Sequence, residues 1–158
     1  KLVQIGWASS LHDIGKIAIS DSIILKPGKL TPDEFELIKS HTTKGSEIIQ
    51  HRIRLNDRAI YEYAYDIARH HHEKYDGKGY PDGLKGDEIS IAAQIVSLVD
   101  VYDALTSKRV YKDAYEPDTA FQMILNGHGG TFSPKLLKAF AEVRSEIERL
   151  LSMYPDEE

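Results

Sequence analysis

The chain has 158 residues, of which 41% are hydrophobic and 28% charged, so it is long enough and apolar enough to fold around a core. A formal net charge of −5 argues against a general DNA- or RNA-binding protein, because such proteins are usually basic. The sequence has no cysteine, which excludes disulfides and thiolate sites, so any metal must be held by imidazole and carboxylate groups.

Helix signals begin at the N-terminus. Apolar residues at helical spacing predict a helix over residues 2–11, and its abrupt beginning leads us to expect that the domain continues upstream of Lys1. The stretch Thr31-Pro32-Asp33-Glu34 combines a capping residue, an N-terminal proline and a capping-box glutamate, and predicts a helix that leads to His41. Another short helix, with Ile48 and Ile49 on its apolar side, is expected after it.

The second half of the chain is also predicted to be helical. Asn56 is a plausible N-cap for a helix that runs into the histidines at 70–72, and a glycine-rich loop covers residues 76–87. Ser90 is expected to cap the next helix. Pro117 and Ser133-Pro134 start two more, the last of which is expected to reach about Met153.

No alternating strand pattern is present in the sequence. We therefore predict one compact all-α domain over residues 1–158, with about seven helices and without its first helix or helices. No signal-peptide pattern and no apolar run long enough for a bilayer is present, so we expect a cytoplasmic protein.

Several histidines and aspartates are candidate metal ligands. They are His12-Asp13, His41, the run His70-His71-His72, and Asp100 with Asp103. Burying several imidazoles is costly unless each finds a partner, and a carboxylate at Asp100 on an apolar helix usually needs a cation or a strong donor. A set of this kind can hold two metal ions about 3.5–4 Å apart, with one carboxylate bridging, to hydrolyse a phosphodiester.

A second set of residues is suited to an anionic substrate. The loop Asp76–Leu84 follows the histidine run and could place Tyr80 and backbone N–H groups over the metals, although a plain glycine-rich turn is the simpler interpretation. Lys16, Arg109, Tyr111 and Lys112 are either scattered surface residues or donors to the phosphates of a diester.

These segments together resemble the HD-GYP family, a branch of the HD superfamily of metal-dependent phosphohydrolases. The matching stretches are LHDIGK at 11–16, KPGKLT at 26–31, HHEKYDGKGYP at 71–81, DVYDALT at 100–106 and RVYK at 109–112. The match follows the family's order over about residues 11–140, and the stretch from His71 to Pro81 is highly specific to the family.

The resemblance implies an all-helical phosphodiesterase with two divalent ions, iron or manganese, that hydrolyses cyclic di-GMP to linear pGpG and in some cases to GMP. The matched metal ligands are His12, Asp13, His41, His71, His72 and Asp100. Asp13 matches the bridging carboxylate, and Lys16 matches a polar residue beside the reacting phosphate. Tyr80, Arg109 and Lys112 match substrate-binding positions. The hypothesis for the reaction is that a metal-bridging hydroxide attacks phosphorus.

The resemblance also leaves alternatives open. The family usually has an upstream helix with a further histidine, and in three-metal members a glutamate, but neither residue type occurs before Leu11. The chain could therefore be a weak enzyme or an inert cyclic dinucleotide receptor and partner module. It could also hydrolyse another cyclic or linear nucleotide. A fused receiver or sensor domain and diguanylate cyclase domains are the expected partners.

Overall fold

The computed structural model describes residues 1–107 and 114–153 of the chain. These residues form nine α-helices and two 3-10 helices and contain no strand, so the predicted all-α class is confirmed. The elements are α1 (Leu2–Ser9), η1 (Ile14–Ala18), α2 (Asp21–Ile24), α3 (Pro32–Lys39), α4 (His41–Arg52), α5 (Arg58–His70), η2 (Gly86–Glu88), α6 (Ile91–Thr106), α7 (Pro117–Leu125), α8 (Pro134–Glu142) and α9 (Arg144–Met153). None of the described helices combines the length and hydrophobicity of a membrane span.

The described residues form two α-helices more than the predicted seven, because α2 was not predicted and one predicted helix is divided into α8 and α9. α2 has no side-chain cap, and the hydroxyl of Ser20 pairs with that of Ser22 instead. The predicted helix from Pro134 to about Met153 is interrupted at Val143, whose backbone angles are φ −100° and ψ 12°. The α8 residue Phe140 and the α9 residue Ile147, on either side of this break, both pack in the second of the two cores described below.

Local capping explains where the other helices start. Thr31 and Glu34 form the predicted capping box at α3, and the hydroxyl of Ser133 accepts from the backbone of α8. The predicted cap of α5 was wrong by one residue. Asp57, rather than Asn56, accepts hydrogen bonds from the first turn, and the amide of Gln4 also donates to its carboxylate.

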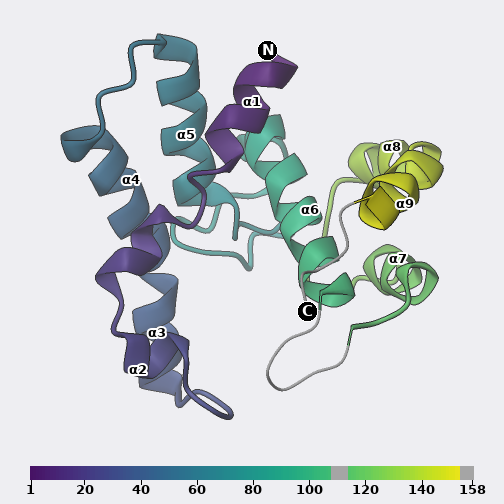
Figure 1. Ribbon diagram of the computed structural model, residues 1–158, viewed down its shortest axis with the longest axis horizontal. Helices are drawn as coiled ribbons and strands as arrows, with labels where there is room; N and C mark the ends of the chain where they lie inside the picture. The colour runs from purple at the N-terminus through teal and green to yellow at the C-terminus, as the bar shows by residue number, and fades with distance from the viewer. Residues whose placement is uncertain (108–113, 154–158) are drawn as a thin grey trace. The chain divides into compact units, whose positions relative to one another are not determined.

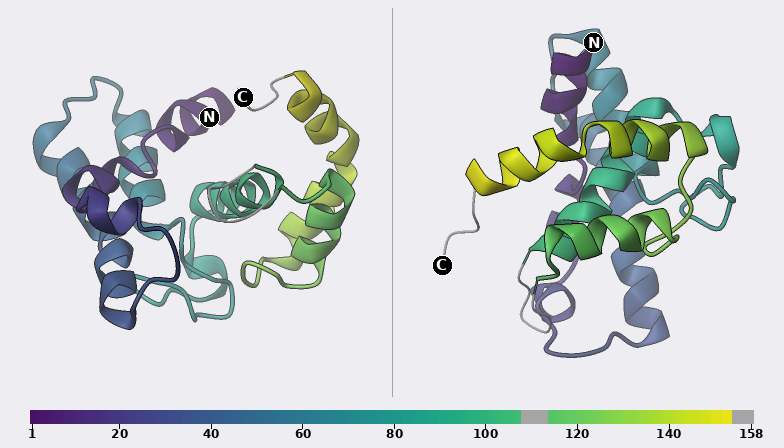
Figure 2. Two further views of the ribbon diagram at one scale, coloured as in Figure 1. Left: turned by 60° about the horizontal axis from the view of Figure 1, so that its bottom comes forward. Right: turned by 90° about the vertical axis from the view of Figure 1, so that its right-hand side faces the viewer.

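The chain divides into two units, Lys1–Ser97 and Leu98–Glu158, and α6 passes from the first into the second. In the first unit α5 lies between α1 and α4, and its core is built from buried residues of these helices and of the start of α6 (Figure 1). The second unit contains α7, α8 and α9 (Figure 2). Its core includes the stacked rings of Phe121 and Phe140. The single domain over residues 1–158 remains a prediction.

Gly15 of η1 brings the segment that carries Asp13 against α4. A Cβ atom at Gly15 would lie 1.9 Å from the carbonyl oxygen of His41 and 2.5 Å from the backbone nitrogen of Gly45. Only glycine therefore allows this backbone contact, because a rigid backbone atom cannot move aside as a side chain can.

Replacing Gly15 with alanine is expected to destabilise the chain by about 1–3 kcal/mol, because the new methyl group must push η1 away from α4. Urea unfolding measures the effect. Gly6→Ala on α1 is the matched control, since a Cβ at Gly6 meets nothing within 4 Å. Equal stability of the two variants would contradict the packing of η1 on α4.

Candidate metal centre

Three histidines are oriented by the same hydrogen bond. In His12, His41 and His71 the Nδ1 atom lies 2.7–2.9 Å from a backbone carbonyl oxygen three or four residues earlier. These carbonyls belong to the last turns of α1, α3 and α5, and those of Ser9 and Ile67 also accept the backbone N–H of His12 and His71. Because a carbonyl can only accept, each Nδ1 carries a proton, and the Nε2 atoms of the buried His41 and His71 carry a lone pair. Metal-binding histidines are held in this way by their second nitrogen.

The lone pairs converge with a carboxylate. The Nε2 atoms of His41 and His71 are 3.3 Å apart, and one ligand atom from each of His41, His71 and His72 lies within 4.8 Å of the others. The Oδ1 atom of Asp13 is 3.4 Å from the Nε2 of His41 and 3.9 Å from that of His71. This Oδ1 is buried and has no hydrogen-bond partner. The Oδ1 of Asp13 and the Nε2 atoms of His41 and His71 are therefore hydrogen-bond acceptors that face one another without a donor between them.

This arrangement fits divalent metal ions. Buried acceptors without donors are unfavourable, and a cation among them would satisfy all of them at once. Imidazole nitrogens with a carboxylate oxygen are ligands typical of iron, manganese and zinc. The nitrogen and oxygen atoms that the first unit brings together are therefore suited to bind a metal, as the residue types in the sequence predict.

The imidazoles of the centre are held neutral. Burial lowers the pKa of His71 to about 3 and that of His72 to about 2. Burial also lowers the pKa of His41, against the opposing effect of its hydrogen bond to the carbonyl of Ile38. The side chains of His41 and His71 are 1% and 0% exposed. At neutral pH their lone pairs are therefore available to a metal without loss of a proton.

Asp13 has cationic and polar neighbours on its second oxygen. Burial raises the pKa of Asp13, but hydrogen bonds from His12 and Lys16 outweigh this effect and hold it well below the usual value. The Nζ of Lys16 lies 2.5 Å from Oδ2 and the Nε2 of His12 lies 3.3 Å from it. Asp13 is thus ionised, with Oδ1 toward the buried histidines and Oδ2 toward Lys16.

The first histidine of the run has a different environment. His70 Nδ1 lies 2.8 Å from Asp66 and its Nε2 lies 3.0 Å from Asp82. Burial lowers the pKa of His70, but these two carboxylates outweigh it and raise the pKa. Arg69 also binds Asp82 through two hydrogen bonds of 2.7 and 2.8 Å. His70 therefore joins α5 to the loop that follows, and its omission from the predicted ligands agrees with this geometry.

The glycine-rich loop folds back over the centre. The ring of Tyr80 stacks on His72, with centroids 4.9 Å apart and planes at 26°. Glu73 is 3% exposed, and its Oε1 accepts from the backbone nitrogens of Asp82 and Gly83 at 2.7 and 3.0 Å. A Cβ at Gly79 would lie 2.4 Å from the Cα of Glu73. Glu73 and Gly79 together fix the loop that carries Tyr80.

Replacing Glu73 with alanine is expected to destabilise the chain by about 1–3 kcal/mol, because two backbone N–H groups lose their acceptor. Glu73→Gln is the matched control, since its amide oxygen can accept the same two hydrogen bonds. Urea unfolding of both variants checks this. A loss of stability as large in the glutamine variant as in the alanine variant would contradict the role of Oε1.

The remaining predicted residues lie elsewhere. Asp100 and Asp103 are on α6 within the second unit, so their part in a metal centre stays a prediction. Arg109, Tyr111 and Lys112 fall outside the described residues, and their predicted contacts with a substrate stay predictions as well.

Sequence reasoning assigned no role to Glu73, Asp66 or Asp82. The position of Glu73 directly after the histidines, with a glycine-rich turn following, was the one local signal that pointed to it. The roles of Asp66 and Asp82 depend on the folding of the loop onto α5, and the sequence carries no local sign of it.

Comparison with known proteins gives the centre a family context. Residues 1–136 match the model of the HD domain family. The chain is 44% identical over 96% of its length to a probable cyclic di-GMP phosphodiesterase of Vibrio cholerae. It is 42% identical over 99% of its length to a cyclic di-GMP phosphodiesterase of Thermotoga maritima. A 3′3′-cGAMP-specific phosphodiesterase 2 of Vibrio cholerae is 40% identical over 94% of the chain. The chain spans only 35%, 42% and 28% of these relatives' own lengths.

Proposed function

The chain belongs to the HD domain family, in its HD-GYP branch, and we propose that it is a metal-dependent phosphodiesterase that hydrolyses cyclic di-GMP to linear pGpG and onward to GMP. The observation that carries the proposal is the convergence of buried, neutral imidazoles on the unpartnered oxygen of Asp13. The names of the relatives at 40–44% identity support the substrate class.

Two divalent ions are the proposed cofactors. His41, His71 and His72 would hold them with Asp13 as the shared carboxylate, and His12 and Asp100 would complete the set. Iron and manganese are the proposed metals, because the family resemblance implies them and the nitrogen and oxygen ligands suit them. When bound, such ions lower the pKa of water and stabilise charge on a phosphoryl group.

The chain's own residues would orient and neutralise the diester. Lys16 lies at the edge of the centre with 45% of its side chain exposed, so its ammonium group can reach a phosphoryl oxygen while it still contacts Asp13. Arg109 and Lys112 are proposed to hold the second phosphate. Tyr80, which lies against His72, would contact the substrate beside the reacting phosphorus. Hydrolysis then breaks the bond from phosphorus to the 3′ oxygen and adds one water.

Turnover of cyclic di-GMP tests the proposal. The purified chain is supplied with ferrous iron or manganese under reducing conditions, and its products are separated by chromatography. The proposal predicts linear pGpG, with GMP appearing later. Bound metal without hydrolysis of any cyclic dinucleotide would favour the receptor alternative, and preferential turnover of the mixed cyclic GMP–AMP dinucleotide would change the assigned substrate.

The other expectations remain predictions. A cytoplasmic location, a fused receiver or sensor domain, and diguanylate cyclase partners are part of the proposal. The chain's coverage of less than half of its relatives' lengths leaves room in those relatives for further domains.

A further inference from the structure

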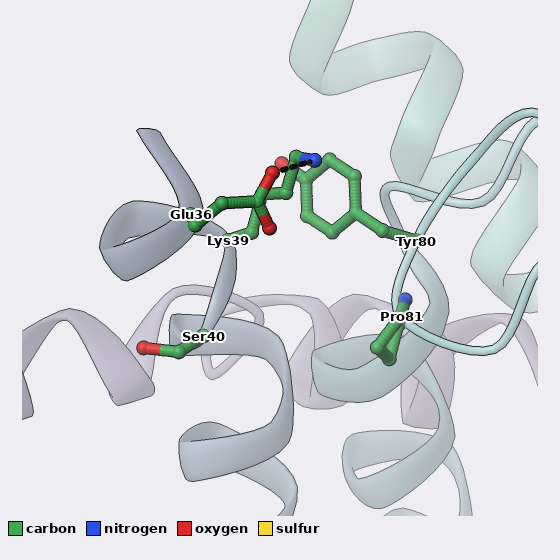
Figure 3. Close-up of a pocket in the computed structure, with 5 residues that line it drawn as sticks. All are labelled: Glu36, Lys39, Ser40, Tyr80 and Pro81. Atoms are coloured by element: carbon green, nitrogen blue, oxygen red, sulfur yellow. Dashed lines mark hydrogen bonds and ion pairs between the residues drawn. The ribbon is translucent and has the colours of Figure 1, made fainter. Parts of the chain in front are cut away.

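A cavity of about 380 Å³ opens beside the metal centre in the first unit. It is lined by Glu36, Lys39, Ser40, Tyr80 and Pro81 (Figure 3). Ser40 directly precedes His41, and the ring of Tyr80 stacks on His72 at 4.9 Å. The cavity therefore adjoins two of the proposed metal ligands. Its volume lies within the range of pockets that bind small molecules.

The lining presents an acceptor, a donor and an aromatic ring side by side. The Nζ of Lys39 donates to the Oε1 of Glu36 at 2.6 Å and lies 5.5 Å from the centre of the Tyr80 ring. The same ammonium group lies 4.9 Å from the centre of the Phe35 ring. In Figure 3 the Tyr80 ring lies next to both charged side chains, which come from α3. Glu36 is 68% exposed and so is accessible to a ligand.

We propose that this cavity binds one purine base of the cyclic dinucleotide and that Glu36 sets a preference for guanine. The inference rests on the proposed function of the adjoining centre. An ionised carboxylate only accepts hydrogen bonds, and guanine offers it two neighbouring donors, N1–H and the N2 amino group. Lys39 can donate to guanine O6 or N7, which are acceptors, and Tyr80 supplies a face for stacking.

Adenine fits the same pair of charges less well. It has a single exocyclic amino group as donor, and its N1 is an acceptor that would face the carboxylate. A bidentate contact to a base discriminates against the wrong base by roughly 5- to 150-fold. Because the base is bound alike before and during the reaction, the difference is expected in KM rather than in kcat.

Base preference of the chain and of Glu36→Gln tests the inference. The ratio of kcat/KM for cyclic di-GMP to that for cyclic di-AMP is measured for both. Glutamine keeps the size of the side chain but places an amide N–H opposite one of the guanine donors, so one hydrogen bond is lost. The ratio is expected to fall by roughly 5- to 150-fold, through KM. Glu62→Gln is the matched control, because Glu62 forms a comparable surface ion pair with Arg58 on α5.

The possible outcomes distinguish a failure of the base-binding assignment of the cavity from a failure of the proposed function. If the chain hydrolyses cyclic dinucleotides and the ratio stays the same in Glu36→Gln, the pocket assignment is wrong and the function stands. If the chain hydrolyses none of them, the proposed function fails, and calorimetric titration with cyclic di-GMP and cyclic di-AMP still tests the pocket. Equal affinities, an unchanged ratio in Glu36→Gln, or no binding of either nucleotide would each overturn the inference.

Discussion

Replacing Asp13 with alanine is expected to lower turnover of cyclic di-GMP by at least about 100-fold and to abolish tight binding of manganese or ferrous iron. Loss of a group that merely supports a metal ligand usually costs 10- to 100-fold in affinity or activity, so loss of the shared carboxylate must cost more. Oδ1 of Asp13 lies 3.4 Å from the Nε2 of His41 and 3.9 Å from that of His71. Calorimetric titration with manganese and the hydrolysis assay measure both effects.

The control for this variant is Asp21→Ala, which removes an exposed aspartate in the first turn of α2. It is expected to keep both metal binding and turnover. Far-UV circular dichroism establishes that Asp13→Ala remains folded, and Asp13→Asn provides a second variant of unchanged shape. If either folded Asp13 variant retained full turnover, Asp13 would not be part of the centre.

Lowering the pH from 7.5 to 5 is expected to reduce the free energy of unfolding of the metal-free chain by roughly 2–4 kcal/mol. In the folded chain the pKa of His71 is about 3 and that of His72 about 2, against a usual value of 6.5. The unfolded chain therefore binds more protons below pH 6.5, so stability is full above that pH and decreases as the pH falls toward 3.

The size of this effect follows from the two shifts. Each of the two neutral histidines accounts for roughly 2 kcal/mol at pH 5. His41, whose pKa burial also lowers, acts in the same direction. His70 acts in the opposite direction, because its pKa is raised in the folded chain and its contribution is present at low pH. Urea unfolding in the presence of a chelator, at several pH values, measures the sum.

A variant of His71 tests whether this residue causes the pH dependence of the free energy of unfolding. His71→Leu is expected to reduce the pH dependence of the free energy of unfolding by about one proton. A free energy of unfolding that did not change between pH 7.5 and 5 would contradict the neutral, buried state of His71 and His72.

The helices were predictable where local chemistry defines their ends. The capping box at Thr31, the proline at Pro117 and the Ser133-Pro134 pair each start a helix as the sequence indicates. α2 and the break at Val143 carry no such signal, because no side chain caps the former and no glycine or proline causes the latter. Tertiary packing decides these two features.

The candidate site was predictable in its residue types but not in its geometry. Histidines and aspartates without cysteine indicate a metal centre, and the ordered motifs indicate the family. The sequence could not show which atoms meet, because the meeting of Asp13 with His41 depends on the backbone contact of Gly15 with α4. It also could not show that His70 turns toward Asp66 and Asp82, while His71 and His72 face the centre.

The specificity pocket lay beyond sequence reasoning for a similar reason. Glu36 and Lys39 are three residues apart on an exposed helix, a spacing typical of ordinary surface ion pairs. They differ from an ordinary surface pair only because the glycine-rich loop folds back and places Tyr80 beside Lys39.

The metal content of the purified chain shows directly whether His41, His71, His72 and Asp13 bind metal. The chain is incubated with ferrous iron or manganese under reducing conditions, freed of excess metal, and analysed by plasma mass spectrometry beside Asp13→Ala. We expect about two ions per chain in the unaltered protein and a clear deficit in the variant. A folded, unaltered chain that retained no transition metal, or a variant that retained as much, would contradict the assignment of His41, His71, His72 and Asp13 as a metal centre.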